Sequence, residues 1–277
     1  MRNKLVIKKK SFLNKLFVKL IRKFGYEIID QADLHIPSRN ISANQNLSKS
    51  GEISISVPLG KTTITRKVKS LAIIIRSYTF GNTDNTKVML DQNKKRIFDL
   101  PKIDYTLRTI KSVIKSCEIA KEFFKDTNIK IIITDDRSSK KNLDKINQLL
   151  NDTILSTQLI NLKENEFNEK IKKIDTNGKT ISENMISNMR NLYKSIEISE
   201  NDDSDLFYFL EDDYIHTKEA ITEMLFTYEK ISTQLNQEIF LCPADYPYLY
   251  STINNSKIFF GNMRHWRTVN ESLITFL

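Results

Sequence analysis

Short runs of apolar residues alternate along the chain with longer segments in which apolar residues recur every three or four positions. Four of the short runs are typical of buried strands, namely residues 71–75, 129–134, 157–162 and 205–210. Four of the longer segments have the spacing of amphipathic helices, namely residues 103–125, 140–151, 180–199 and 217–234. Strands that alternate with helices predict an α/β fold, in which helices flank a mostly parallel sheet.

The apolar positions also predict what the later elements bury. The stripe of helix 180–199 expected to face the core consists of Met185, Met189, Leu192 and Ile196. Beside it runs a polar row at helical spacing, Asn184, Asn188 and Asn191. Three more strands are predicted towards the C-terminus, at residues 238–242, 257–260 and 266–276.

The N-terminal part has a different pattern. Residues 11–25 combine apolar residues at helical spacing with cations on the other faces, which predicts a basic amphipathic helix. Alternation over residues 52–57 and 62–66 predicts a β-hairpin. We therefore expect an N-terminal extension over residues 1–68 and a main domain over residues 69–277. The helix could lie on an anionic membrane surface or pack on the main domain.

Polar side chains follow three of the predicted strands directly. They are Arg76 and Ser77, Asp135 and Asp136, and Glu211, Asp212 and Asp213. Ligands bind beyond the carboxyl ends of the strands in open α/β sheets. Three adjacent carboxylates repel one another unless a cation joins them, and Mg²⁺ or Mn²⁺ with phosphate ligands is the usual solution. A solvated acidic turn at the start of the next helix explains the acids equally well.

Charge and composition narrow the function classes. The formal net charge is +9, but residues 1–23 hold nine of the 43 Lys and Arg and none of the 34 acids. The rest of the chain is therefore formally neutral, which argues against nucleic acid as a partner. The two cysteines, Cys117 and Cys242, match no zinc or redox spacing. With no secretory signal and no apolar run of membrane-spanning length, we expect a cytoplasmic protein, whose N-terminal helix could be peripheral on the inner membrane face.

Four stretches together resemble a known family. They are LAIIIRSY (71–78), IIITDDRSS (131–139), NMISNMRNLYKSIE (184–197) and LFYFLEDDY (206–214). In this order they resemble nucleotide-sugar-dependent glycosyltransferases of the GT-A fold, closest to the family 2 type, over roughly residues 70–250. The resemblance implies a GT-A, Rossmann-like sheet. Glu211 and Asp213 match the outer positions of the family's Asp-x-Asp metal motif, and Arg190 with Asn191 matches its Arg-Asn pair.

The resemblance and the chemistry of sugar transfer imply roles for individual residues. The expected metal ligands, for Mg²⁺ or Mn²⁺, are Glu211, Asp213 and His265, of which His265 could equally be a plain surface histidine. The expected substrate-binding residues are Arg76, Ser77, Asp135, Asp136, Asn188, Arg190 and Asp212. An inverting enzyme also needs a base for the acceptor hydroxyl, and Asp245 is the candidate.

The expected function is metal-dependent transfer of a sugar from a nucleotide-diphosphate donor to a glycan, lipid or protein acceptor. Its expected partners are the nucleotide sugar, a glycan or lipid-linked acceptor and an anionic membrane surface. Two alternatives stay open at this point. One is a sugar nucleotidyltransferase, although neither common Gly-rich phosphate loop occurs among the six glycines. The other is a non-catalytic, membrane-associated carbohydrate-binding protein.

Overall fold

The structure is a computed structural model that describes residues 12–26, 49–50, 53–54, 63–79, 100–174, 178–244, 246–250 and 256–269. The chain divides into two compact units, Met1–Thr63 and Ile64–Leu277, and each is described by itself. No helix in the described part of the chain is long and apolar enough to cross a bilayer. The domain boundary expected between residues 68 and 69 stays a prediction.

The first unit contains one helix and one small hairpin among its described residues. The predicted amphipathic helix is confirmed as α1 (Phe12–Lys23). Strands β1 (Lys49–Ser50) and β2 (Ile53–Ser54) pair antiparallel. The hairpin therefore lies earlier in the chain than its alternating pattern predicts, and residues 63–66 form no strand. The part of the predicted hairpin at residues 55–62 lies outside the described residues.

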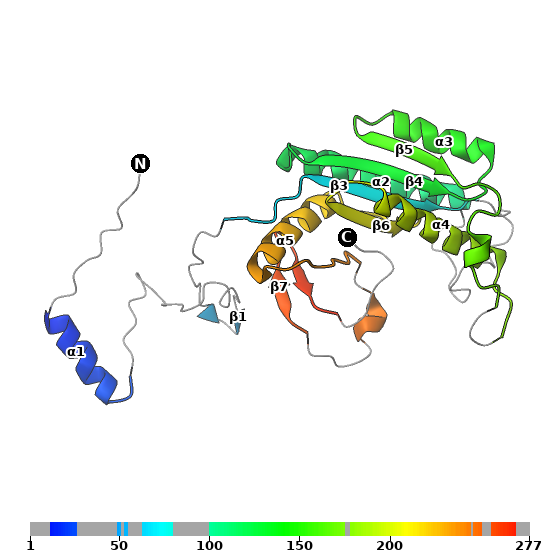
Figure 1. Ribbon diagram of the computed structural model, residues 1–277. Coiled ribbons are helices and arrows are strands. Elements are labelled where there is room, and N and C mark those ends of the chain that lie inside the picture. Colours follow the sequence, from blue (N-terminus) through cyan, green and yellow to red (C-terminus); the bar gives the residue numbers. More distant parts are fainter. Residues whose placement is uncertain are drawn as a thin grey trace. The chain divides into compact units, whose positions relative to one another are not determined.

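The second unit is built on a four-stranded, wholly parallel sheet (Figure 1). Its strands are β3 (Ser70–Ser77), β4 (Asn128–Asp135), β5 (Ser156–Asn161) and β6 (Leu206–Glu211). They lie in the order β5-β4-β3-β6, which confirms the predicted α/β class with a parallel sheet. Because β6 is an edge strand, Phe207 and Phe209 are only half-buried, whereas their apolar run predicts burial on both faces.

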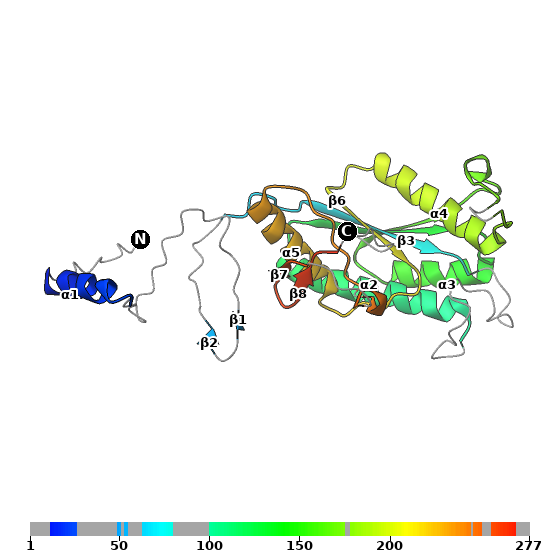
Figure 2. The same cartoon turned by 90° about the horizontal axis from the view of Figure 1, so that it is seen from below.

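Helices cover both faces of this sheet (Figure 2). The helices are α2 (Lys102–Phe123), α3 (Lys140–Asn151), α4 (Glu183–Glu200) and α5 (Ala220–Leu235), with short 3-10 turns η1 (Asn168–Lys170) and η2 (Pro247–Tyr250). Helix α4 covers one face, while α2, α3 and α5 cover the other. Serine side chains cap two of them, since Ser139 accepts from the amide of Asn142 and Ser182 from that of Met185.

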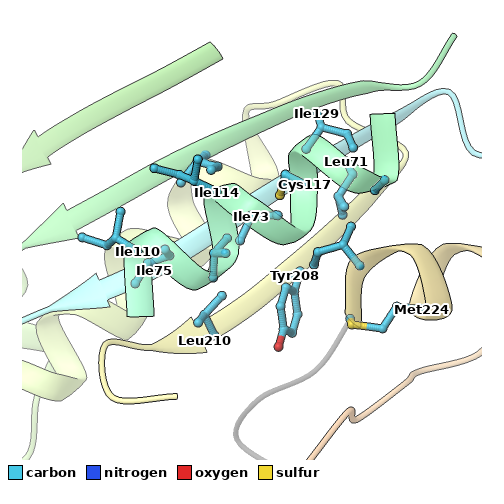
Figure 3. Packing of buried hydrophobic residues seen from close by; sticks show 14 of the residues in the cluster. Leu71, Ile73, Ile75, Ile110, Ile114, Cys117, Ile129, Tyr208, Leu210 and Met224 are labelled. Carbon is cyan, nitrogen blue, oxygen red and sulfur yellow. The ribbon is translucent and has the colours of Figure 1, made fainter. Parts of the chain in front are cut away.

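The main core lies between the sheet and α2 with α5 (Figure 3). Alternate residues of the strands, such as Ile73, Ile75 and Tyr208, meet Ile110 and Cys117 of α2, and all are fully enclosed. Full burial of such a side chain contributes roughly 1.5–3 kcal/mol to folding. The α4 side holds only a small apolar cluster, in which Ala72, Ile74 and Ile132 are buried. The hydrophobic contribution is therefore concentrated on the α2 and α5 side.

The predicted inward stripe of α4 is wrong. Leu192 and Ile196 are each 42% exposed. The residues that α4 buries are instead polar, namely Ser187, Arg190, Asn191 and Ser195. The helix is turned because its arginine and asparagine satisfy polar groups at the ends of β3 and β4. The most apolar side of a helix is therefore not always the side that faces the sheet.

The C-terminal strands are fewer and shorter than predicted. Residues 238–242 form no strand, although Ile239 and Leu241 turn towards the core and Phe240 outward. That alternation has no partner strand in the described part of the sheet. Strands β7 (Ile258–Phe260) and β8 (His265–Arg267) form an antiparallel pair, and residues 270–276 of the last predicted strand lie outside the described residues.

A buried carboxylate holds the β7–β8 turn against α5. Glu223 of α5 accepts hydrogen bonds from the backbone amides of Asn262, Met263 and Arg264, at 2.7–3.2 Å. It also accepts one from the indole Nε1 of Trp266, at 3.0 Å. The turn therefore closes around a single anion, which replaces water as the acceptor for these donors.

We expect Gly261→Ala to loosen this turn, because an added Cβ would lie 2.1 Å from Oε1 of Glu223 and 2.7 Å from Nε1 of Trp266. The expected loss is about 1–3 kcal/mol in the free energy of unfolding, measured by urea denaturation. Asn262→Ala, at an exposed neighbour that contributes its backbone amide, is the matched control. Equal midpoints for both variants would contradict the close packing around Glu223.

Candidate functional site

The predicted polar residues meet at the carboxyl edge of the parallel sheet. Arg76 pairs in register with Glu211, and Ser77 pairs with Asp135. The strand order also reverses at this point, since β4 lies on one side of β3 and β6 on the other. Ligand sites of open α/β sheets form where the strand order reverses. The candidate site is therefore the edge formed by the ends of β3, β4 and β6.

Asp135 organises the loop that follows β4. Its carboxylate accepts hydrogen bonds from the amide of Ser138 at 2.9 Å and from Oγ of Ser138 at 2.6 Å. Ser138 Oγ in turn accepts from the amide of Thr79, which ties this loop to the end of β3. Burial raises the pKa of Asp135, and the two bonds from Ser138 act in the opposite direction. Asp135 is thus enclosed and already bonded, and its contact with substrate stays a prediction.

Asp136 and Arg190 form a fully buried ion pair. The guanidinium Nη1 of Arg190 lies 3.2 Å from Oδ1 of Asp136, and the two side chains are 4% and 1% exposed. The other donors of Arg190 reach main-chain carbonyls, Nε that of Glu166 at 2.9 Å and Nη2 that of Lys163 at 2.7 Å. Arg190 therefore connects β4, α4 and the segment after β5. Its donors are taken by the protein, so its predicted phosphate contact gains no support from this geometry.

Helix α4 also binds the end of β3. Asn191 Nδ2 donates to the carbonyl of Ser77 at 3.0 Å, and the same carbonyl accepts from the amide of Asp136. Nearer the start of α4, Asn184 Oδ1 accepts from the hydroxyl of Tyr78 at 2.9 Å. The polar row predicted along α4 thus faces the strand ends. Asn188 lies on the same helix and is half-buried.

Arg137, in the loop after β4, has an unusual backbone conformation that the sequence does not indicate. It has a φ of 67°, in the left-handed region that few residues other than glycine adopt. Its guanidinium lies over the ring of Tyr78, 5.6 Å from the centroid, and its Nη1 reaches Glu183 at 3.2 Å. Both contacts offset the backbone strain. No spacing of residues indicates a left-handed arginine here, so this residue was not predicted.

The acids at the end of β6 lie among cations from two other elements. Arg76 is 5% exposed, and its Nη2 lies 3.3 Å from Oε1 of Glu211. Burial raises the pKa of Glu211, and the neighbouring charges of Asp213 and Asp212 raise it further, whereas Arg76 lowers it. Burial is therefore the largest cause of the raised pKa of Glu211, and Arg76 opposes it.

Asp212 is the enclosed member of the three acids. Lys102, at the start of α2, lies 2.5 Å from its Oδ1, and Thr106 donates to its Oδ2 at 2.7 Å. The amide of Tyr78 donates to the same Oδ2 at 3.4 Å. Asp212 thus joins β6, α2 and β3 and has a structural role. Lys102 and Thr106 were not predicted, because nothing in a helix start identifies the acid it will meet.

Asp213 is the most exposed of the three acids. Its side chain is 30% exposed, and its nearest described cation is Lys102, whose Nζ lies 3.9 Å from its Oδ2. His265 lies exposed on β8, and within the described ranges no three His, Cys, Asp or Glu side chains gather as a metal-binding group. His265 is therefore not assembled with Glu211 and Asp213 into the predicted three-ligand set. Asp245, the predicted base, lies outside the described residues.

Comparisons with known proteins identify no family for this chain. The chain matches no protein-family model and no curated protein sequence.

A separate groove of about 540 Å³ lies between α2 and α3. Its lining consists of Leu100, Asp104, Leu107, Arg108, Lys111, Lys145, Gln148, Leu149 and Asp152. None of the predicted site residues is among them, so the groove is distinct from the candidate site.

We expect Arg190→Met to destabilise the fold strongly, because it leaves the buried carboxylate of Asp136 without its main partner. The expected loss is about 3–5 kcal/mol in urea denaturation. Lys194→Met, one turn further along α4, removes a more exposed pair with Glu166 and should cost less than about 1 kcal/mol. Adding Asp136→Asn to Arg190→Met should recover part of the loss, since no buried charge then stands alone. Similar losses from Arg190→Met and Lys194→Met would refute the structural role of Arg190.

Two substitutions should move the pKa of Glu211 in opposite directions. Asp213→Asn should lower it by removing a like charge, and Arg76→Met should raise it by removing the cation. Carboxyl carbon titration by NMR, with Glu211 assigned through Glu211→Gln, measures both shifts. A raised carboxyl pKa also means that the fold holds this proton more tightly than the unfolded chain. Its contribution to stability therefore falls as the pH rises from the unfolded to the folded pKa. Shifts of the same sign in the two variants would contradict the arrangement.

Proposed function

We propose that the second unit is a GT-A-type glycosyltransferase, which moves a sugar from a nucleotide-diphosphate donor to a glycan, lipid or protein acceptor. The observation that carries the proposal is the alternation of charge at the carboxyl edge of the sheet. Two partly exposed carboxylates, Glu211 and Asp213, lie beside two cations, Arg76 and Lys102. A diphosphate that carries a divalent ion has the same mixture of charges, so such an edge can bind it.

The donor set of this edge fits Mg²⁺ or Mn²⁺. Magnesium is usually bound by one or two carboxylates together with substrate phosphates, rather than by a complete cage of protein ligands. Glu211 and Asp213 would hold the ion, since both carboxylates are partly exposed at this edge. A bound divalent ion would act as a Lewis acid that stabilises the negative charge of the departing diphosphate.

The remaining acids and Arg190 support the site from beneath. Asp135, Asp136 and Asp212 are each at most 4% exposed, and each is bonded to neighbouring segments. They fix the ends of β4 and β6, so that the partly exposed carboxylates keep their orientation when substrate binds. Arg190 is therefore a positioning residue in this proposal rather than a phosphate ligand.

Cations beside the acids would assist the donor. Lys102, 27% exposed, stands at the start of α2, where the helix dipole also favours a negative group. Arg76 holds Glu211 in place from the neighbouring strand. For the acceptor, Asp245 remains the proposed base, which would take the hydroxyl proton as the new glycosidic bond forms.

The test is an assay of donor hydrolysis and transfer with UDP-, GDP- and TDP-sugars in the presence of Mn²⁺. We expect turnover on at least one donor, and a loss on the order of 100-fold or more in Asp213→Asn, because charge stabilisation of the leaving group is removed. Asp203→Asn, an exposed acid in the loop before β6, is the matched control and should keep full activity.

Other results identify the other function classes. Release of pyrophosphate from a nucleoside triphosphate and a sugar phosphate would indicate a nucleotidyltransferase. Absence of turnover on every donor, with nucleotide-sugar binding by calorimetry unchanged in Asp213→Asn, would exclude the transferase and favour a non-catalytic carbohydrate-binding protein.

A further inference from the structure

Helix α1 carries an apolar side that is not enclosed. Leu16, Phe17 and Leu20 are 53–57% exposed, and Phe24, in the turn that follows, is 71% exposed. These positions are spaced so that they share one side of a helix. Large apolar residues grouped in this way differ from the single exposed ones that every protein has. We therefore expect the apolar side of α1 to bind another surface.

The charges on α1 point to a negative occupant. Lys19, Arg22 and Lys23 are exposed, and the last two lie in the final turn of the helix. Residues 1–23 contain no acid, and every excess positive charge of the chain lies in them. The rest of the chain is formally neutral, so it offers no excess of negative charge to match this helix. A surface with anionic groups outside and an apolar interior matches both the cations and the apolar side of α1.

We propose that α1 binds the surface of an anionic lipid bilayer, lying in the plane of the membrane. Its apolar side would enter the boundary between headgroups and acyl chains, while the lysine and arginine stems extend to the lipid phosphates. At ~1.5 Å per residue the helix is about 18 Å long, shorter than the bilayer core, so it lies on the membrane rather than across it. This inference goes beyond the proposed function and does not depend on it.

Binding of α1 to the bilayer would hold the protein at the membrane surface. A protein tethered in this way meets other membrane-bound molecules at a raised effective concentration. One amphipathic helix gives reversible attachment, whose strength follows the anionic lipid content and the ionic strength.

The test is co-sedimentation of the full chain with vesicles. One set contains about one third phosphatidylglycerol in phosphatidylcholine, and the other contains phosphatidylcholine alone. We expect binding to the anionic vesicles at least about 10-fold stronger, and weaker binding as NaCl is raised. The triple variant Lys19→Glu, Arg22→Glu, Lys23→Glu should lose on the order of 100-fold in the partition coefficient.

Charge alone could change vesicle binding, so a matched variant is needed. Lys125→Glu, Lys140→Glu, Lys141→Glu reverses three exposed lysines in or beside α2 and α3 of the second unit. It has the same net charge as the α1 variant and should bind almost as well as the unmodified chain. An equal loss in both triple variants would overturn the assignment to α1.

The apolar side is tested separately. Phe17→Ser with Leu20→Ser should remove most binding to anionic vesicles, whereas Ile154→Ser with Phe240→Ser, at residues 91% and 84% exposed, should not. Equal binding of the unmodified chain to neutral and anionic vesicles, or no binding to either, would refute the proposal.

Two measurements without lipid address the other occupants. If Phe17→Ser with Leu20→Ser lowers the unfolding midpoint of the chain, the side is covered by protein. If sedimentation velocity instead shows that the double variant dissociates a dimer, a second copy of the chain covers the apolar side of α1. Either result would overturn the lipid assignment, and the proposal predicts neither change.

Discussion

The guanidinium of Arg190 is enclosed by oxygen atoms that belong to separate segments of the chain. A charge removed from water in this way is tolerated only when it is paired and its donors are used. The requirement fixes the position of α4 over β4, and it fixes the segment around Lys163 and Glu166 over α4. Asn191 extends the same constraint to the end of β3. These polar bonds hold the carboxyl ends of β3 and β4 against α4.

The acids at the same edge differ in how deeply they are buried. Those nearest the protein interior, Asp135, Asp136 and Asp212, are committed to lysine, arginine or serine partners. Glu211 and Asp213 lie further out, and their charge is only partly balanced by Arg76 and Lys102. The three adjacent acids thus differ in depth, with the middle residue buried and bonded and the outer two partly exposed.

Many of the strands and helices could be predicted from the spacing of apolar residues within each segment. The strand at 129–134 and the helix at 140–151 are predicted almost to the residue, because buried strands and capped helices depend on neighbours in sequence. The orientation of α4 could not be predicted, because it depends on which backbone groups of β3 and β4 need partners. Residues 238–242 have the alternation of a strand, but among the described residues no neighbouring strand pairs with them. The convergence of polar side chains at parallel strand ends was predictable, whereas the pairing of Lys102 with Asp212 was not.

The polar attachment of α4 gives the two faces of the sheet different responses to temperature. Apolar burial weakens on cooling, because its driving force near room temperature is largely entropic. That weakening falls on the α2 and α5 face, where the large apolar cluster lies. The α4 face rests mainly on hydrogen bonds and ion pairs, among them the buried pair of Arg190 with Asp136, and these do not share this origin. In the cold, the polar face should become the relatively stronger support of the ends of β3 and β4. Asp212 at the end of β6 is instead held by Lys102 and Thr106 of α2, so it depends on the layer that weakens.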